Sequence, residues 1–282
     1  MSSNELKFLI EFKNKYLHGN IDELADFSFW DINTNAGEYF SGNKRVQPEE
    51  YFDGDRTKIV YTIQYLLLNG SGIPNFSHDA PGRQYTGDTI NTFNSLFGKT
   101  PELRKKIERK FGFSEREKEL RNNFYRTYQC IGNFYILPAA TVKSGNRIES
   151  INTLRGTNEW RDFFDLFLSN LDLCLSGAGN ADARLKTLIN IGINKEFFDT
   201  FPSVRDFCAL FYMEDYLQAD FNHPDNTSAV SHYTFTVGSD EYKAFAFGYV
   251  KKASELIKCR SQKIIKALKT KYPELNFQNP KF

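Results

Sequence analysis

Histidine and cysteine, which hold most protein-bound zinc ions, are scarce in this sequence. The 282 residues include four of each, and the histidines are His18, His78, His223 and His232. No cysteine pair has the CxxC spacing, and no histidine lies at ligand spacing from a cysteine. The signatures of nucleophile elbows, P-loops and kinases are missing as well. We therefore predict no metal site, no cofactor and no catalytic residue.

Long hydrophobic runs are also missing. No stretch reaches the about 18 consecutive apolar residues that mark a membrane-spanning helix. The first residues place acidic Glu5 before the apolar positions, where a signal peptide carries basic residues. The cysteines lie far apart, which favours free thiols in a reducing compartment. They are Cys130, Cys174, Cys208 and Cys259. We expect a cytoplasmic protein without membrane contact.

Aromatic side chains, by contrast, make up 16% of the residues, with 27 Phe and 15 Tyr. Disordered chains contain few such residues, and a chain of this length buries enough surface to fold without disulfides or metal. The composition therefore predicts an ordered globular protein in which most rings fill the core, while any exposed rings would serve a partner surface.

The net charge is only +1, but charges of one sign are clustered along the chain. Residues 20–56 hold nine acids and three bases, a net of −6, and residues 157–225 hold twelve acids and five bases, a net of −7. Residues 99–126 hold ten bases and five acids, a net of +5, and residues 243–271 hold nine bases and one acid, a net of +8. Such clustering bears on partners and assembly, so the basic segments are expected to meet acidic segments of another copy, or nucleic acid.

Helix signals dominate, because apolar residues recur at three- and four-residue spacing between recognisable caps. Asp88, Thr100 and Ser114 are natural N-caps, and Ser114 forms a capping box with Glu117. We expect helices over 4–17, 88–97, 101–112, 114–129, 157–175, 181–191, 203–218 and 240–271.

Strand signals are fewer. Residues 130–138 and 228–237 read as strands, residues 139–148 as a loop, and the apolar segment 57–69 as either a buried helix or a buried strand. The sequence therefore predicts a mainly helical α+β fold with a small β-sheet and a long C-terminal helix. We expect a main α+β domain over 1–225 and a second unit, a strand plus the long basic helix, over 226–282.

One short pattern suggests an enzyme. Pro224-Asp225, followed by Glu241-Tyr242-Lys243, matches the PD-(D/E)xK pattern of nucleases that hold Mg²⁺ with two carboxylates. In those enzymes the E-x-K residues lie on a strand, whereas Glu241 and Lys243 fall in the first turn of an expected helix and point about 200° apart. We therefore interpret Glu241 as an acid that complements the helix dipole, and predict no enzyme, with a nuclease as the alternative.

Residues 99–126 interleave bases with aromatic rings, a composition that binds phosphates and stacks the bases of single strands. Five acids share the segment, so a solvated charged face is favoured over direct nucleic-acid binding. The rings are Phe111, Phe113, Phe124 and Tyr125.

The expected C-terminal helix combines an apolar stripe with a strongly basic remainder. At about 30 residues it spans about 45 Å. We predict that its bases contact an acidic partner or another copy in a salt-sensitive manner, an ordinary docked helix being the alternative. The candidate partner or assembly residues are Lys251, Lys252, Lys258, Arg260, Lys263, Lys266 and Lys269.

Three further segments resemble a family of uncharacterised proteins of bacteria and their phages, over about residues 57–175. They are YTGDTINTF at 85–93, IGNFYILP at 131–138, and NTLRG at 152–156 with WRDFFDLFL at 160–168. Within them, Asn133, Asn152 and Arg155 are polar residues in apolar surroundings, which we expect to satisfy buried backbone groups near the strand.

This resemblance, together with the chain length and the missing active site, points to a phage anti-defence protein that blocks the Gabija system. It implies an inhibitor in the host cytoplasm, which assembles around a bacterial nuclease–helicase complex and acts by stoichiometric protein–protein contact. The clustered charges add the expectation of a homo-oligomer. The alternatives are a nucleic-acid-binding protein or Mg²⁺-dependent nuclease, and a structural or assembly protein of a phage or mobile element.

Overall fold

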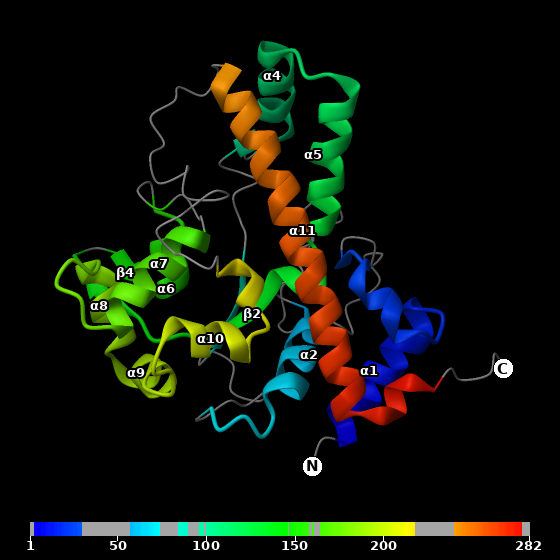
Figure 1. Cartoon of the computed structure of the whole chain (residues 1–282), viewed down its shortest axis with the longest axis vertical. Helices are drawn as coiled ribbons and strands as arrows, with labels where there is room; N and C mark the ends of the chain where they lie inside the picture. The colour runs from blue at the N-terminus through cyan, green and yellow to red at the C-terminus, as the bar shows by residue number, and fades with distance from the viewer. Residues whose placement is uncertain are drawn as a thin grey trace.

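The computed structural model describes residues 3–29, 57–73, 84–89, 96–98, 100–145, 147–157, 160, 164–217 and 240–277. Over these residues the protein is a mainly helical α+β structure, which confirms the fold class (Figure 1). The α-helices are α1 (Ser3–Tyr16), α2 (Lys58–Leu68), α4 (Pro101–Phe111), α5 (Glu115–Thr127), α6 (Ile151–Arg155), α7 (Phe164–Leu175), α8 (Ala183–Ile189), α9 (Gly192–Phe198), α10 (Val204–Leu210) and α11 (Asp240–Lys271). Short 3₁₀ helices are η1 (Ile21–Ala25), η5 (Ile131–Asn133), η6 (Glu214–Tyr216) and η8 (Pro273–Asn276).

Two small antiparallel sheets accompany the helices. Strand β1 (Gln84–Asp88) pairs with the fully buried β2 (Phe134–Pro138), and β3 (Val142–Ser144) pairs with β4 (Arg147–Glu149). Asp88 lies opposite Phe134 in the β1–β2 ladder. Asp88 therefore ends a strand where the sequence predicts the start of a helix over 88–97. Leu96 and Phe97 are helical and Gly98 follows with φ of 97°, as expected for the end of that helix, while residues 90–95 lie outside the described residues. The expected loop over 139–148 likewise contains the β3–β4 pair, and the expected strand over 228–237 lies outside the described residues.

The ambiguous apolar segment 57–69 forms helix α2. Its first turn is capped by Thr57, whose hydroxyl accepts a hydrogen bond from Val60 N at 3.3 Å. Most of its side chains are buried, including the polar Thr62 and Gln64. Periodicity cannot distinguish such an all-round apolar helix from a buried strand, whereas the cap favours the helix.

The long helix α11 runs through the middle of the molecule, with other helices packed on both sides of it (Figure 1). Helices α4 and α5 lie beside its N-terminal part, α1 and η1 beside its C-terminal part, and the group α6–α10 on the other side. The predicted apolar stripe is buried along its whole length. Its members are Tyr242, Ala246, Tyr249, Ala253, Leu256, Ile257, Ile264 and Leu268. The helix is therefore part of the core, while the proposed boundary between 225 and 226 lies outside the described residues, so the division into two units stays a prediction.

Three expected helices are shorter than predicted. In the segment 157–175, Thr157 and Trp160 are not helical, and α7 spans Phe164–Leu175. The segment 181–191 contains α8, which ends at Ile189, and α9 begins at Gly192. In the segment 203–218, helix α10 ends at Leu210, because Tyr212 adopts a left-handed backbone conformation with φ of 58°. The hydrogen bond from Met213 N to Cys208 O, at 2.7 Å, then closes the helix end. No described helix has the length and apolar character needed to cross a membrane.

Candidate interaction surface

The lysines of α11 that the sequence nominates for partner contact differ in their exposure. Lys251, Lys258 and Lys266 are exposed, whereas Lys252, Lys263 and Lys269 are partly buried. They project from α11 opposite or beside its buried stripe, as expected for an amphipathic helix.

Several of these lysines pair with acids of the same chain. Lys269 Nζ lies 2.8 Å from Asp22 Oδ2, and Lys258 Nζ lies 3.8 Å from Asp26 Oδ1. Both acids belong to the acidic segment 20–56. Lys263 Nζ lies 2.8 Å from Asp215 Oδ2, in the acidic segment 157–225. The acidic segments therefore neutralise part of the α11 charge within one molecule. The sequence analysis instead expects these bases to meet the acids of another copy or of a partner.

Arg260 is buried, so the structure corrects its assignment to a partner surface. Its Nε donates to Phe211 O at 2.8 Å, and its Nη1 donates to Gly132 O at 2.7 Å and to Phe134 O at 2.8 Å. Burial lowers the pKa of its guanidinium to about 10. Arg260 therefore fastens α11 to η5, β2 and the end of α10.

The thiol of Cys259 lies near the surface beside an ion pair. Its Sγ donates a hydrogen bond to Asp215 Oδ2 at 2.9 Å, and the same carboxylate pairs with Lys263. The hydrogen bond from Cys259, followed by that from Lys263, lowers the pKa of Asp215. The same contact with Asp215 raises the pKa of Cys259, which keeps this thiol protonated and poorly nucleophilic.

Helices α4 and α5 form a hairpin whose turn is set by sequence. Thr100 caps α4 by accepting from Leu103 N at 3.2 Å, and Gly112 ends α4 in the left-handed conformation. Ser114 and Glu117 form the predicted capping box at the start of α5. The caps explain why these two helices begin where the sequence predicts.

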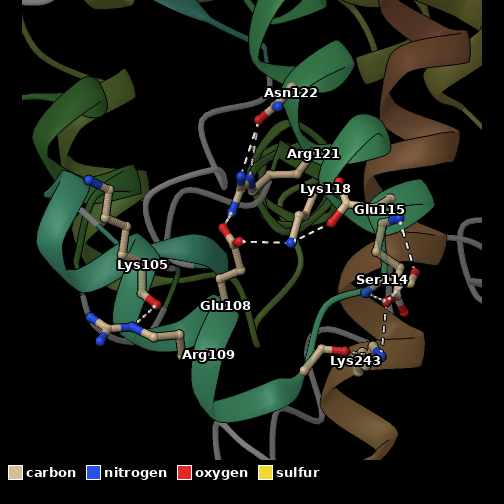
Figure 2. A network of polar contacts seen from close by, with 11 residues as sticks. Lys105, Glu108, Arg109, Ser114, Glu115, Lys118, Arg121, Asn122 and Lys243 are labelled. Atoms are coloured by element: carbon tan, nitrogen blue, oxygen red, sulfur yellow. Dashed lines mark hydrogen bonds and ion pairs between the residues drawn. The ribbon is translucent and has the colours of Figure 1, made fainter.

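Two acids of the hairpin, Glu108 and Glu117, are partly buried and belong to a polar network between α4, α5 and α11 (Figure 2). Glu108 accepts from Arg121 Nη1 at 2.9 Å and lies 3.3 Å from Lys118 Nζ. The bond from Arg121 is the largest influence on the pKa of Glu108, which it lowers. Glu117 Oε2 lies 2.9 Å from Lys243 Nζ, on the first turns of α11.

The rings of the segment 99–126 also face inward. Phe113 and Phe124 are buried, and Phe111 and Tyr125 are partly buried against the core. The Arg104 guanidinium lies 5.4 Å from the centre of the Tyr125 ring. These rings therefore contribute to packing and do not form the exposed stacking surface that a single-stranded nucleic acid requires.

The bases of α4 that remain outside form what we call the α4 basic face, consisting of Lys105, Lys106, Arg109 and Lys110. All four side chains are exposed. Figure 2 shows Lys105 and Arg109 on the side of α4 away from α11. No described carboxylate lies within ion-pair distance of the four. The sequence shows the net charge of this segment but not this separation of bases from acids.

The residues of the nuclease-like pattern are only partly described. Asp225 lies outside the described residues, whereas Glu241 and Lys243 both fall in the first turn of α11, as the sequence predicts. Lys243 pairs with Glu117 and also donates to Gly112 O at 3.4 Å. Across the described ranges, no three or more His, Cys, Asp or Glu side chains gather in a group able to hold a metal ion.

The three polar residues of the family-like segments have different environments. Asn133 is buried; it donates to Tyr128 O at 2.9 Å and accepts from Thr89 Oγ1 at 2.8 Å, which fits the expectation. Asn152 is exposed on α6, which corrects the expectation for that residue. Arg155 is buried and donates to the Tyr135 hydroxyl at 3.0 Å, with its guanidinium 5.3 Å from the Phe164 ring centre.

Comparison with known families identifies a match over most of the folded chain. The model of a family of unknown function (DUF6994) matches residues 84–264, which extend from β1 to the C-terminal part of α11. No curated protein and no solved structure matches the chain. The matched range includes the α4–α5 hairpin, the β1–β2 sheet and the lysines of α11 up to Lys263.

Proposed function

Since the chain belongs to this family of unknown function, we propose from its surface that it is a non-catalytic binding protein, which inhibits a bacterial target by stoichiometric contact. The observation that carries the proposal is a set of lysines on α11, Lys251, Lys252 and Lys266. No described carboxylate lies within ion-pair distance of these three. The hydrogen bond from Cys259 lowers the pKa of Asp215 most, and Lys252 contributes to this lowering without forming an ion pair. Within the described residues, the charge of these three lysines therefore stays available to an acidic partner.

The remaining cations of α11 have roles inside the molecule. Lys258, Lys263 and Lys269 pair with acids of the same chain, and Arg260 binds backbone carbonyl groups. Exposed ion pairs of this kind contribute only about 0–1 kcal/mol each, so they position side chains more than they stabilise the fold. The contact with a partner is therefore assigned to the unpaired lysines.

We propose as the target the nuclease–helicase complex of the bacterial Gabija defence system, and as the setting the cytoplasm of an infected cell. The support is the resemblance of residues 85–93, 131–138 and 152–168 to bacterial and phage proteins. A nuclease that holds Mg²⁺ with carboxylates carries acidic surface near its active site. Such a surface has the charge complementary to the α11 lysines.

The test compares two variants with the same change of charge. The α11 triple variant carries Lys251→Gln, Lys252→Gln and Lys266→Gln, and the α4 triple variant carries Lys105→Gln, Lys106→Gln and Lys110→Gln. Gln and Lys have similar helix propensities, so both variants should fold. DNA cleavage by the purified Gabija complex is measured against increasing amounts of each protein.

We expect the α11 triple variant to need at least about tenfold more protein for half-inhibition, since losing each charged contact costs on the order of 1 kcal/mol. The DNA is kept in large molar excess over the protein, so that any DNA held by the α4 basic face does not limit cleavage, and the α4 triple variant should then inhibit within about twofold of the wild type on the same scale. Equal inhibition by the wild type and the α11 triple variant, or no inhibition by the wild type, contradicts the proposal.

A further inference from the structure

We propose that the α4 basic face binds the phosphate backbone of double-stranded nucleic acid. The inference goes beyond the proposed function, whose partner is a protein that contacts α11. It begins from the arrangement of Lys105, Lys106, Arg109 and Lys110, which occupy two adjacent positions on each of two successive turns. Successive turns are about 5.4 Å apart, so the four cations form a compact array on one side of the helix.

Three acids of the hairpin pair with cations outside the α4 basic face. Glu108 is engaged by Arg121 and Lys118, Glu115 by Lys118, and Glu117 by Lys243. On the exposed side of α4 the described carboxylate is Glu102, in the first turn. Its own backbone N–H lowers the pKa of Glu102 most, and Lys105 contributes to this lowering without forming an ion pair. Four exposed cations therefore face solvent with one acid near the start of the same helix.

The neighbouring helix α5 shows that such separation is not general. Its exposed positions carry Glu115 and Glu119 together with Arg116 and Arg126, so the two signs are balanced there. On the exposed side of α4, by contrast, cations outnumber acids by four to one. Favourable interaction with the helix dipole accounts for Arg109 and Lys110 in the last turn, but not for Lys105 and Lys106 in the middle of the helix.

The chemistry of the face favours nucleic acid over protein. Lysine and arginine supply most protein contacts with phosphate, and on α4 four of them lie on two successive turns, whereas the three α11 lysines are spread along about 20 Å of helix. The face consists of three lysines and one arginine, and the rings of the hairpin are turned toward the core. Because the face has no rings that could stack on bases, we expect it to contact the phosphate backbone of the nucleic acid. A duplex carries one negative charge about every 1.7 Å along its axis.

The experiment measures binding of the full-length protein to a fluorescently labelled DNA duplex of arbitrary sequence by anisotropy, over a series of salt concentrations. The α4 triple variant is compared with the wild type and with the α11 triple variant, which loses the same charge elsewhere. Circular dichroism and urea unfolding check that both variants fold like the wild type.

We expect the wild type to bind the duplex at about 50 mM salt and the α4 triple variant to bind roughly tenfold or more weakly. The slope of log affinity against log salt should fall in magnitude by about 2 to 3, one for each lost phosphate contact. The α11 triple variant should keep the wild-type slope.

Three results would overturn the inference. One is a wild type that does not bind the duplex at low salt. Another is an equal loss of affinity in both triple variants, which indicates a response to net charge alone. The third is a wild type that binds an acidic peptide, such as polyglutamate, more tightly than the duplex, together with an α4 triple variant that no longer binds the peptide. That result would assign the face to a protein partner. Inhibition of the Gabija complex is measured separately, so failure here and failure of the proposed function are distinguishable.

Discussion

Two buried cations join distant parts of the chain through backbone carbonyl groups. Arg260 of α11 binds the carbonyls of Phe211, Gly132 and Phe134. Lys13 of α1 donates to Phe277 O at 2.7 Å, and burial lowers its pKa. A buried cation is tolerated only where hydrogen-bond acceptors replace its lost water, so both side chains fix the position of the segments they contact.

The first prediction at this scale concerns Arg260→Met. The change keeps much of the side-chain volume but leaves the three carbonyl groups without this donor, so we expect a loss of about 3–5 kcal/mol in the free energy of unfolding. Urea unfolding at neutral pH measures it. Lys258→Met, two positions away on the exposed side of α11, is the control and should change stability by less than about 1 kcal/mol. Equal stabilities for the two variants would contradict the role of Arg260.

A substitution at Gly132 tests whether η5 lies as close to α11 as the structure shows. A Cβ atom at this position would collide with the Ile257 carbonyl oxygen and lie 2.5 Å from Ser261 Oγ, which accepts from Gly132 N at 3.0 Å. Gly132→Ala should therefore cost about 2–4 kcal/mol in the free energy of unfolding.

The matched control is Gly179→Ala, where a Cβ meets nothing within 4 Å. We expect this change to be neutral or to stabilise by up to about 1 kcal/mol, because alanine restricts the unfolded chain. If Gly132→Ala unfolds at the same urea concentration as Gly179→Ala, α11 does not pack on η5 as described.

The sequence predicts such residues poorly because their partners are remote. Lys13 interrupts the apolar periodicity of α1, and its acceptor Phe277 lies at the other end of the chain. Arg260 has the same appearance in sequence as the exposed lysines around it. Asn133 was predictable, because its acceptor Tyr128 lies five positions away on the chain.

At the scale of elements, helix α8 depends on one charged cap. Asp182 Oδ1 accepts from Arg184 N at 2.8 Å and from Leu185 N at 3.1 Å. Burial raises the pKa of Asp182, but these hydrogen bonds and the Arg184 side chain outweigh it, so the pKa lies below its ordinary value of 3.8. Because the pKa is lower in the folded state, ionised Asp182 stabilises the protein above the unfolded-state value, and this contribution is lost as pH falls through the folded-state value.

We therefore expect Asp182→Ala to cost about 1 kcal/mol at pH 7, and Asp182→Asn to cost less, since asparagine retains the cap. As the pH falls below 3.8, the stability of the wild type should approach that of Asp182→Asn. Urea unfolding of the three proteins at neutral and acidic pH measures these differences. A wild-type advantage over Asp182→Asn that grows with acidification contradicts the assignment.

Elements with local signals were predictable, and so was β2 (Phe134–Pro138) within the strand expected over 130–138, whereas strands β1, β3 and β4 were not. The caps at Thr100 and Ser114 and the periodicity of α11 are confirmed. Asp88 resembles a helix cap in sequence, but its pairing with Phe134 makes it the end of a strand. The sequence does not show this pairing, because the partner strand lies about 50 residues away along the chain. The α4 basic face could not be predicted from the sequence either, since the net charge of a segment does not show which of its side chains form ion pairs.

At the scale of the whole molecule, part of the charge clustered along the chain is neutralised by ion pairs within the fold. Asp22 and Asp26 meet α11 near its C-terminal part, and Asp215 meets it near its middle. Among the described cations without an ion pair, two groups stand out, the three lysines of α11 and the α4 basic face, while others such as Arg116, Lys186 and Arg205 are exposed singly. We assign the first to a protein partner and the second to a polyanion.

The assembly prediction follows from the same charges. A homo-oligomer held by exposed charges should dissociate as salt rises, because these charges are screened within about 10 Å at 0.1 M. We expect the mass measured by light scattering to exceed 32.7 kDa at low salt and to fall toward it at high salt. A mass of one chain under both conditions contradicts the predicted oligomer.

The central claim is that the protein acts by binding and not by turnover. Its most direct test is a titration in which a fixed amount of the purified Gabija complex receives increasing amounts of this protein, and the remaining DNA cleavage is measured after different incubation times. The account predicts that inhibition saturates at a fixed molar ratio and does not change with time. Inhibition that deepens with time at trace amounts of the protein would contradict it.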